Sequence, residues 1–139
     1  MIPYIKAKLV KKLVDFFGSD FRRIEHALSV LGHAEHIAEG RTDLDYEVLV
    51  AASLFHDVGI KPSEEKLGYN NGRTQEQYGP PEAERLLRDI SFPEEKTKKI
   101  RDIVGNHHSP SRFDYPELAI VKQADAIVNR LESEGGAPG

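Results

Sequence analysis

A continuous apolar run near the middle of the chain ends in two polar residues. The run covers residues 48–55, its only hydroxyl is that of Ser53, and His56 and Asp57 follow it directly. A run of this length that is apolar on all sides predicts a buried central helix. An imidazole and a carboxylate at the end of a buried helix need partners, and a divalent cation is the natural one. We therefore expect other parts of the chain to supply further ligands around His56 and Asp57.

Helical periodicity recurs on both sides of this run, and the alternation typical of a strand is almost absent. Apolar residues three or four positions apart predict further helices. The approximate predicted ranges are 3–17, 20–39, 46–56, 80–90, 93–108 and 114–131. Asp20, and either Asp43 or Asp45, stand where the second and third helices need an N-cap, and Gly59 follows the third helix as a stop. The predicted fold is all-α, a single-domain bundle of about six helices.

Residues 61–81 interrupt this pattern. They contain three glycines, three prolines and few large apolar side chains. Loops longer than about 12–15 residues in compact domains are usually functional or disordered. Because this segment follows His56 and Asp57 directly, we expect a long loop that forms a lid or a wall of the substrate site. Further on, the sequence Ser-Phe-Pro-Glu at residues 91–94 predicts a capping box.

Composition excludes several classes of protein. The chain has 139 residues, a net charge of −4 and no cysteine. Its length suits one domain, predicted over residues 1–132, followed by a flexible glycine-rich tail at 133–139. The negative charge argues against a stable nucleic-acid partner, and no apolar run approaches the roughly 18 residues of a membrane span. The absence of cysteine suits a reducing cytoplasm, which is the predicted location.

Two further candidate ligands lie far from the central pair. His26 falls on the second predicted helix and Asp125 on the last, and both have apolar neighbours. The order of His26, the pair His56 and Asp57, and then Asp125 resembles that of the HD-domain metal-dependent phosphohydrolase superfamily. The resemblance runs over residues 21–129, which would form the core of the HD domain.

This resemblance implies an HD-type helical bundle around a divalent metal, with His26, His56, Asp57 and Asp125 as ligands. Two imidazoles and two carboxylates balance the charge of such an ion, so the cluster can be buried. Mixed nitrogen and oxygen ligands without thiolate suit Mn, Fe, Co, Ni or Mg. Asp57 is the candidate catalytic residue, because a ligand carboxylate can orient a metal-activated water and take its proton.

The implied activity is hydrolysis of a phosphoester by a phosphatase or a phosphodiesterase. The expected partner is a small phosphorylated substrate, a nucleotide or a related metabolite, and neither a membrane nor a nucleic acid is expected. The alternative is a non-catalytic regulatory HD module that binds metal or nucleotide, but the complete set of four ligands favours an enzyme. Oxygenase chemistry, known in distant relatives, needs more histidines and ranks last. The pattern is compatible with an oligomer.

A second group of candidate residues follows the first. Residues 75–83 carry a Gln-Glu…Gly-Pro-Pro…Ala segment similar to that of small stand-alone bacterial HD proteins, and His107 and His108 end the fifth predicted helix. Histidines at this place bind a second ion in two-metal members of the superfamily, usually with another histidine from the preceding segment, and this chain has none there. Glu76 is the candidate replacement. Glu76, His107 and His108 therefore either bind a second metal or line the substrate site.

The remaining charged and imidazole side chains divide into two sets. His33 and His36 have no counterpart in the family pattern and are expected to lie outside the metal site. A phosphate group needs positive charge nearby, so basic residues close to a candidate ligand in sequence are candidates to bind it. These candidates are Arg22, Arg23, Lys61, Arg73 and Lys122. We expect at least one of them to contact phosphate.

Overall fold

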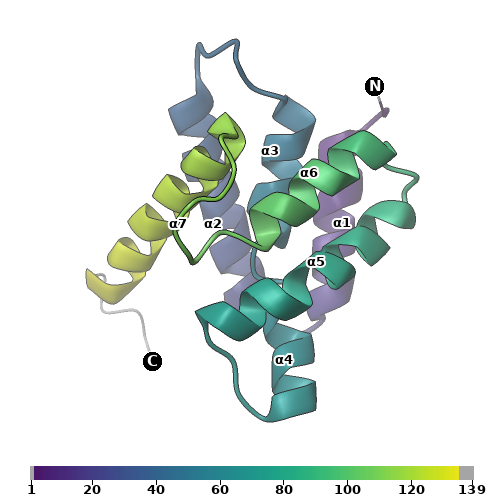
Figure 1. Cartoon of the computed structure of the whole chain (residues 1–139), viewed down its shortest axis with the longest axis vertical. Helices are drawn as coiled ribbons and strands as arrows, with labels where there is room; N and C mark the ends of the chain where they lie inside the picture. The colour runs from purple at the N-terminus through teal and green to yellow at the C-terminus, as the bar shows by residue number, and fades with distance from the viewer. Residues whose placement is uncertain (1, 135–139) are drawn as a thin grey trace.

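The computed structural model describes residues 2–134, and all regular structure in that part of the chain is helical (Figure 1). The prediction of an all-α fold is confirmed, with seven helices in the described residues in place of about six. They are α1 (Ile5–Phe17), α2 (Phe21–Ala38), α3 (Tyr46–Phe55), α4 (Ile60–Leu67), α5 (Gly72–Arg88), α6 (Glu94–Val104) and α7 (Pro116–Glu134). None of these helices is long and apolar enough to cross a membrane.

Helix α3 lies at the centre of the fold. Every residue from Glu47 to Phe55 is buried, as the continuous apolar run predicts. Helices α1, α2, α6 and α7 pack against α3, and α2 also packs along α7. Because α2 lies against both α3 and α7, side chains from these three helices can meet at one point.

The starts of α2 and α3 follow local capping chemistry. The side chain of Asp20 accepts a hydrogen bond from the backbone N–H of Arg23. Asp45, and not Asp43, accepts the corresponding bond from Val48. Both caps satisfy an N–H group that the helix itself leaves without a partner, and they fix where these two ligand-bearing helices begin.

The predicted capping box at residues 91–94 is wrong. Helix α6 begins after Pro93, whose side chain cannot accept a hydrogen bond. Ser91, which was expected to supply the cap, instead adopts a left-handed φ of 55° in the turn before the helix. The two glutamates in the first turn of α6 favour the helix through its dipole without a cap.

The expected long loop at residues 61–81 is also wrong, because helix α4 and the first half of α5 occupy it. A capping box starts α5: the Asn71 side chain accepts from the N–H of Thr74, and the Thr74 hydroxyl accepts from the N–H of Asn71. Pro80 and Pro81 lie inside α5. Proline lacks the N–H group of a helix interior and usually breaks it, which is why the sequence favoured a loop here.

Helix α5 approaches the end of α3 so closely that no side chain fits between them. A Cβ atom on Gly59 would lie 2.4 Å from the carbonyl oxygen of Gln75 and 2.7 Å from the backbone nitrogen of Gly79. A Cβ atom on Gly79 would lie 2.6 Å from Cγ1 of Val104. Gly59 was expected to stop the third helix, but α3 ends at Phe55 and Gly59, with a φ of −72°, directly precedes α4. Its missing side chain instead lets α5 lie directly beside the residues that follow α3.

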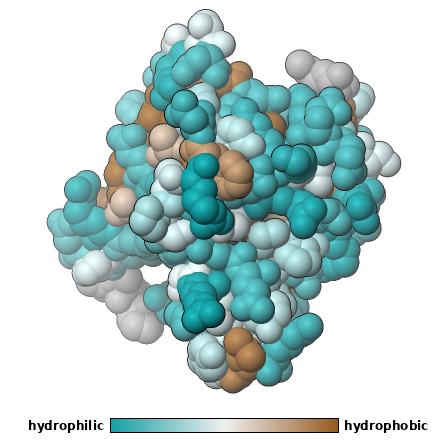
Figure 2. All heavy atoms as spheres, in the orientation of Figure 1, coloured by the Kyte–Doolittle hydropathy of each residue, from teal (hydrophilic) through white to brown (hydrophobic). Residues whose placement is uncertain are grey.

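The last helix extends into the segment predicted as a tail. Helix α7 is described through Glu134, so the first two residues of the segment 133–139 are helical, and 135–139 lie outside the described residues. The face of the molecule in Figure 2 is mostly hydrophilic, and its hydrophobic atoms form small separate areas.

Candidate metal centre

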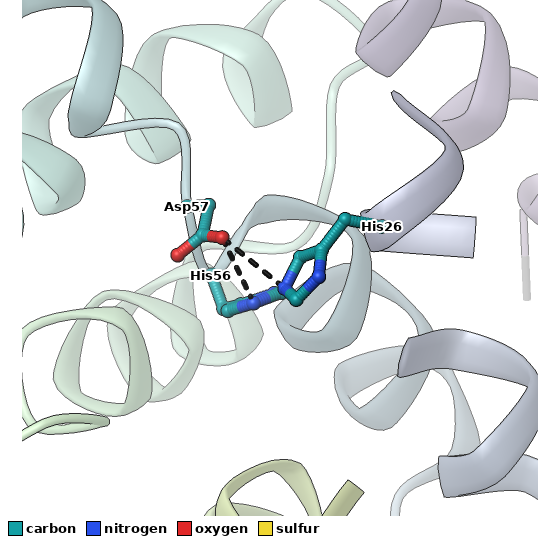
Figure 3. Close-up of side chains that lie close together, drawn as sticks. All are labelled: His26, His56 and Asp57. Atoms are coloured by element: carbon teal, nitrogen blue, oxygen red, sulfur yellow. Dashed lines mark ion pairs between the residues drawn. The ribbon is translucent and has the colours of Figure 1, made fainter. Parts of the chain in front are cut away.

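Three helices bring the four predicted ligands to one point. His26 lies within α2, Asp125 lies within α7, and His56 and Asp57 directly follow α3. The side chain of His56 is fully buried, and the other three are 11–15% exposed. Figure 3 shows the carboxylate of Asp57 directed toward both imidazoles. The fold therefore brings together the four residues that the sequence singled out.

The facing atoms form a ring in which imidazole nitrogens alternate with carboxylate oxygens. Nε2 of His26 lies 3.4 Å from Oδ2 of Asp57 and 3.1 Å from Oδ1 of Asp125. Nε2 of His56 lies 3.3 Å from each of the same two oxygens. Ligands about 2.1 Å from a common ion stand roughly 3.0–3.4 Å apart in octahedral or tetrahedral geometry. The edges of the ring therefore match the spacing of neighbouring ligands around one divalent ion, and the ligand atoms of His26, His56 and Asp57 all lie within 4.8 Å of one another.

The hydrogen bonds of His56 favour metal binding. Its Nδ1 donates to the carbonyl oxygen of Ser53 at 2.7 Å. Its Nε2 is buried and has no hydrogen-bond partner in the described part of the chain. A neutral imidazole that donates through Nδ1 presents a lone pair at Nε2, and here that lone pair faces two carboxylate oxygens at 3.3 Å, so a cation between them is the partner that this form of His56 needs. These residues therefore fit a divalent ion.

Without a metal, the four residues satisfy one another electrostatically. Burial alone would lower the pKa of both imidazoles, but the facing carboxylates outweigh it, so the pKa of His26 is raised and that of His56 lies well above its usual range. Burial alone would raise the pKa of Asp57 and Asp125, but the imidazoles hold both below their usual range. At a pH below the raised pKa values of both imidazoles, the metal-free ring holds two positive and two negative charges. When the imidazoles are neutral, the two carboxylates balance the charge of one divalent ion in the same way. Binding of the ion therefore releases two protons from the ring.

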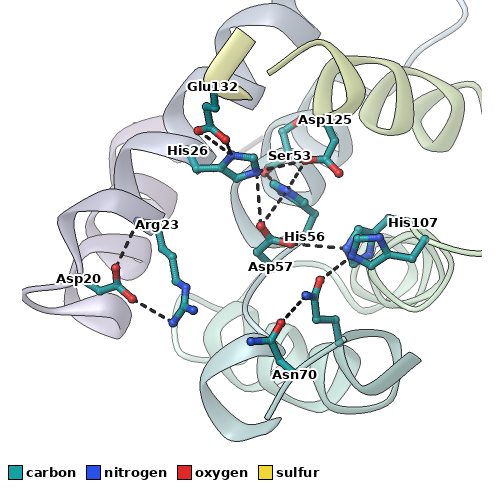
Figure 4. A network of polar contacts seen from close by, with 12 residues as sticks. Asp20, Arg23, His26, Ser53, His56, Asp57, Asn70, His107, Asp125 and Glu132 are labelled. Carbon is teal, nitrogen blue, oxygen red and sulfur yellow. Dashed lines mark hydrogen bonds and ion pairs between the residues drawn. The ribbon is translucent and has the colours of Figure 1, made fainter. Parts of the chain in front are cut away.

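Asp57 also faces a second group of nitrogen atoms. Its Oδ1 lies 3.6 Å from Nε2 of His107, whose Nδ1 donates to the carbonyl oxygen of Val104 at 2.7 Å. This Nε2 is buried and, among the described residues, has no hydrogen-bond partner. Asp57, His107 and His108 bring three candidate ligand atoms within 4.8 Å of one another. Asp57 therefore presents one oxygen to the ring and the other to His107 (Figure 4).

Glu76 does not belong to this second group. Its Oε2 accepts hydrogen bonds from the backbone N–H groups of His108 and Ser109 and from the Ser109 hydroxyl, all at 2.9–3.0 Å. Burial alone would raise the pKa of Glu76, but these donors lower it. The carboxylate thus holds the segment between α6 and α7, and the structure does not bring it to Asp57.

Gln75, which the sequence analysis did not single out, lies next to His108 instead. Its amide nitrogen donates to Oδ1 of Asn70, which leaves its Oε1 to accept from Nε2 of His108. Gln75 and Glu76 are adjacent in the segment that carried the resemblance. The sequence could not tell which of the two would face the site, because that depends on how α5 docks through Gly59.

Two of the five predicted phosphate-binding residues line a cleft over the ring. The cleft has a volume of about 270 Å³. It is lined by Arg22, Arg23, His26, Asp57, Ile60, Gln75, His108, Asp125, Asn129 and Glu132. Arg23 forms ion pairs with Asp20 and Glu64 at 3.2 and 3.1 Å, whereas Arg22 forms none with any described residue. Arg22 is therefore the arginine whose charge is available to an anion in the cleft.

The other three basic residues point elsewhere. Lys61 donates to the carbonyl oxygen of Phe16 at 3.1 Å, on the side of α1. Lys122 donates to the carbonyl oxygen of Ser109 at 2.6 Å and helps to hold the segment between α6 and α7. Arg73 is exposed and does not line the cleft. The structure does not bring these three side chains to the ring.

His33 and His36 lie apart from both groups of candidate ligands. They line a separate surface hollow, and Nδ1 of His36 is 3.6 Å from a carboxylate oxygen of Glu39. Neither imidazole belongs to a set of three candidate ligands in the described chain.

Glu132 is a second residue that the sequence analysis missed. Its carboxylate lies 3.0 Å from Nδ1 of His26, on the side of the imidazole that faces away from the ring. Glu132 follows Asp125 by seven residues, a spacing that places both on one face of a helix. That spacing was a readable signal, because Asp125 was already a predicted ligand.

Comparisons with known proteins agree with this fold. The family model described as HD domain matches residues 23–130, which include all four residues of the ring. The chain therefore belongs to the HD-domain family. A solved structure described as a predicted HD superfamily hydrolase from an uncultured Thermotogales bacterium is similar, with a TM-score of 0.66 and 22% identity, and the match covers 92% of this chain and 74% of that one. At this identity the likeness shows the fold, and no match is found among curated proteins.

Proposed function

We propose that this HD-domain protein is a metal-dependent phosphohydrolase that cleaves a phosphoester of a small phosphorylated metabolite or nucleotide. Membership of the HD superfamily supports a metal-dependent hydrolase. The observation that carries the proposal is the ring of four ligand atoms, in which the buried Nε2 of His56 has no hydrogen-bond partner in the described chain. Mn, Fe, Co, Ni and Mg all suit its nitrogen and oxygen donors.

The chain's own residues hold and orient the reacting groups. When bound, the divalent ion supplies a water molecule of lowered pKa and polarises a phosphoryl oxygen. Asp57 lies in the wall of the cleft, and its Oδ1 is turned away from the ring toward His107. It is the candidate to orient the attacking water and accept its proton. Ser53 contributes through its carbonyl oxygen, which fixes the tautomer of His56.

The cleft supports a compact, polar substrate. Ile60 is the only aliphatic residue of its lining, and the described lining contains no Phe, Tyr or Trp on which a nucleobase could stack. Arg22 provides a cation and Asn129 an amide on the walls. These features favour a substrate recognised through its phosphate group over one recognised through a base.

The rival function is a regulatory module that binds metal or nucleotide without turnover. The position of the cleft argues against it, since the cleft opens directly onto ring residues His26, Asp57 and Asp125. A substrate phosphate could therefore reach the ion that the ring would hold.

The proposal is tested by metal analysis of the purified protein and a phosphate-release screen over small esters, nucleotides and diesters. Mn²⁺, Co²⁺, Ni²⁺ and Mg²⁺ are added in turn. We expect a divalent ion to bind, and phosphate release that is lost in Asp57→Asn and kept in His36→Gln, a matched variant of an exposed imidazole. Tight metal and nucleotide binding without release from any ester would establish the regulatory module instead.

A further inference from the structure

One face of α7 holds the imidazole of His26 from both sides. Nε2 of His26 lies 3.1 Å from Oδ1 of Asp125, and Nδ1 lies 3.0 and 3.1 Å from the two carboxylate oxygens of Glu132. Asp125 and Glu132 are seven residues apart, which is two helical turns. Figure 4 shows the imidazole between the two carboxylates. Asp125 belongs to the ring, whereas in the described structure Glu132 forms no hydrogen bond or ion pair with a ring residue other than His26.

The other two buried imidazoles are oriented in a different way. His56 donates through Nδ1 to the carbonyl oxygen of Ser53, and His107 donates through Nδ1 to that of Val104. In both cases the acceptor is three residues earlier, at the end of a helix. The last carbonyl groups of a helix have no partner within it, so they are available to a side chain.

His26 cannot use this device, because it lies well inside α2. There the backbone carbonyl groups already accept the hydrogen bonds of the helix. An acceptor for Nδ1 must therefore come from another element, and Glu132 on α7 is the side chain that supplies it.

We propose that Glu132 is a positioning residue: its carboxylate fixes the tautomer and orientation of His26, so that Nε2 presents its lone pair to the ion. The inference rests on the proposed metal site. Carboxylate partners behind a ligand imidazole commonly change metal affinity by about 10–100-fold. The side chain of Glu132 is 40% exposed, so solvent screens part of its charge and the lower half of that range is expected.

The first experiment measures metal affinity by calorimetric titration of the full chain with Mn²⁺ or Co²⁺. Glu132→Ala removes the acceptor and should weaken binding by at least about tenfold. Glu132→Gln keeps an oxygen that can accept from Nδ1, so it should lose less. The matched control is Glu134→Gln, because Glu134 lies two residues further along α7 and faces Arg130 at 3.6 Å. The metal affinity of Glu134→Gln should equal that of the unchanged chain.

The second experiment separates positioning from a purely structural role. Proton and nitrogen-15 NMR of the Mg²⁺-loaded protein, in which the ion would occupy Nε2 of His26, reports how fast the proton on Nδ1 exchanges with water. We expect slow exchange of this proton in the unchanged chain, where Glu132 accepts from Nδ1, and faster exchange in Glu132→Ala, with the thermal midpoint of the metal-free protein little changed. Weaker metal binding that comes only with unfolding of the metal-free variant would overturn the inference.

The outcomes also separate this inference from the proposed function. If Glu132→Ala binds metal as tightly as the unchanged chain and its Nδ1 proton exchanges as slowly, Glu132 is not a positioning residue and the metal site stands. If the unchanged chain binds no divalent ion, the metal site itself is wrong and the inference falls with it.

Discussion

The two sides of Asp57 differ in how their polar groups are held. On the ring side, His26, His56 and Asp125 belong to or directly follow packed helices. On the other side, His107 and His108 lie between α6 and α7, where Glu76 and Gln75 bond to the segment. Packed helices can hold a buried lone pair in place without a hydrogen bond to it. In the segment between α6 and α7, Nε2 of His108 is already bonded to Gln75, and of its two imidazoles only His107 has an Nε2 without a hydrogen-bond partner in the described structure. We therefore expect the ring to bind its ion more tightly than the second group.

The largest effect is expected at the residue that both sides share. Asp57→Ala should abolish metal retention and hydrolysis, because it removes a ligand from each group and leaves two imidazoles facing one carboxylate. Breaking such a buried pair also destabilises the fold by roughly 3–5 kcal/mol. Metal content, phosphate release and chemical unfolding measure the three losses. Retained metal with full activity would contradict the site assignment, and His33→Gln should leave all three quantities unchanged.

A change confined to the ring should be severe for metal binding and mild for the fold. Asp125→Asn keeps the shape of the side chain and removes its charge. We expect metal affinity to fall by roughly 100-fold or more, beyond the effect of residues that act only through a ligand. Calorimetric titration with the divalent ion measures this affinity. Unchanged metal content would show that Asp125 is structural.

Metal affinity should also depend on pH, and more steeply than for a site whose imidazoles are already neutral. The pKa values of His26 and His56 are raised above 6.5, so both are protonated in the metal-free protein below those raised values. The ion must displace these protons, and affinity should fall about tenfold per pH unit for each proton displaced. Calorimetry in buffers of different ionisation enthalpy counts the protons released. Affinity independent of pH between 6 and 8 would count against the exchange.

The same groups set the stability of the metal-free protein. A histidine whose pKa is raised by folding stabilises the fold fully below its unfolded value of about 6.5, and this contribution is lost as the pH rises through the folded value. Asp57 and Asp125, whose pKa values are lowered, contribute above about 3.8 and lose that contribution as the pH falls through their folded values. Unfolding of the metal-free chain should therefore be hardest between these limits.

The smallest effect on metal binding is expected on the side away from the ring. Glu76→Gln should leave the affinity of the ring for its ion unchanged, because the carboxylate contacts only the segment that carries His108 and Ser109. The free energy of unfolding should fall by roughly 1–3 kcal/mol, since three donors lose a charged acceptor. If Glu76→Gln instead removed a bound ion, Glu76 would be a ligand after all.

The four ring residues could be predicted because each can be recognised from its neighbours in the sequence. A polar pair at the end of an apolar helix, and further polar residues on apolar helix faces, are visible in the sequence as groups that need partners. The resemblance to the HD-domain superfamily then indicated that these residues lie together around one metal ion. Asp20 and Asp45 were predictable as caps for a similar reason, because an N-cap depends on residues within one turn.

Apart from the capping box at residues 91–94 and the start of the predicted tail, the errors concern contacts between segments far apart in the chain. The segment 61–81 resembled a loop because its helices carry few large apolar side chains, yet α5 docks through backbone contact at Gly59 and Gly79. The roles of Gln75 and Glu76 depend on that docking. Lys61 and Lys122 lie close to a ligand in sequence, but their side chains extend toward other helices and segments. The closeness of a basic residue to a ligand in the sequence did not predict where its side chain points.

The crossing of Gly59 and Gly79 has a consequence for how such a domain can change its substrate. Because main chain meets main chain there, the distance from α5 to the ring does not depend on the side chains that line the cleft. Arg22, Gln75 and Asn129 can be exchanged without a shift in the helices that position the ligands. If the proposed function is correct, the scaffold separates two tasks: we expect the packed interior to determine which ion is held, and the side chains that line the cleft to determine which molecule reaches it.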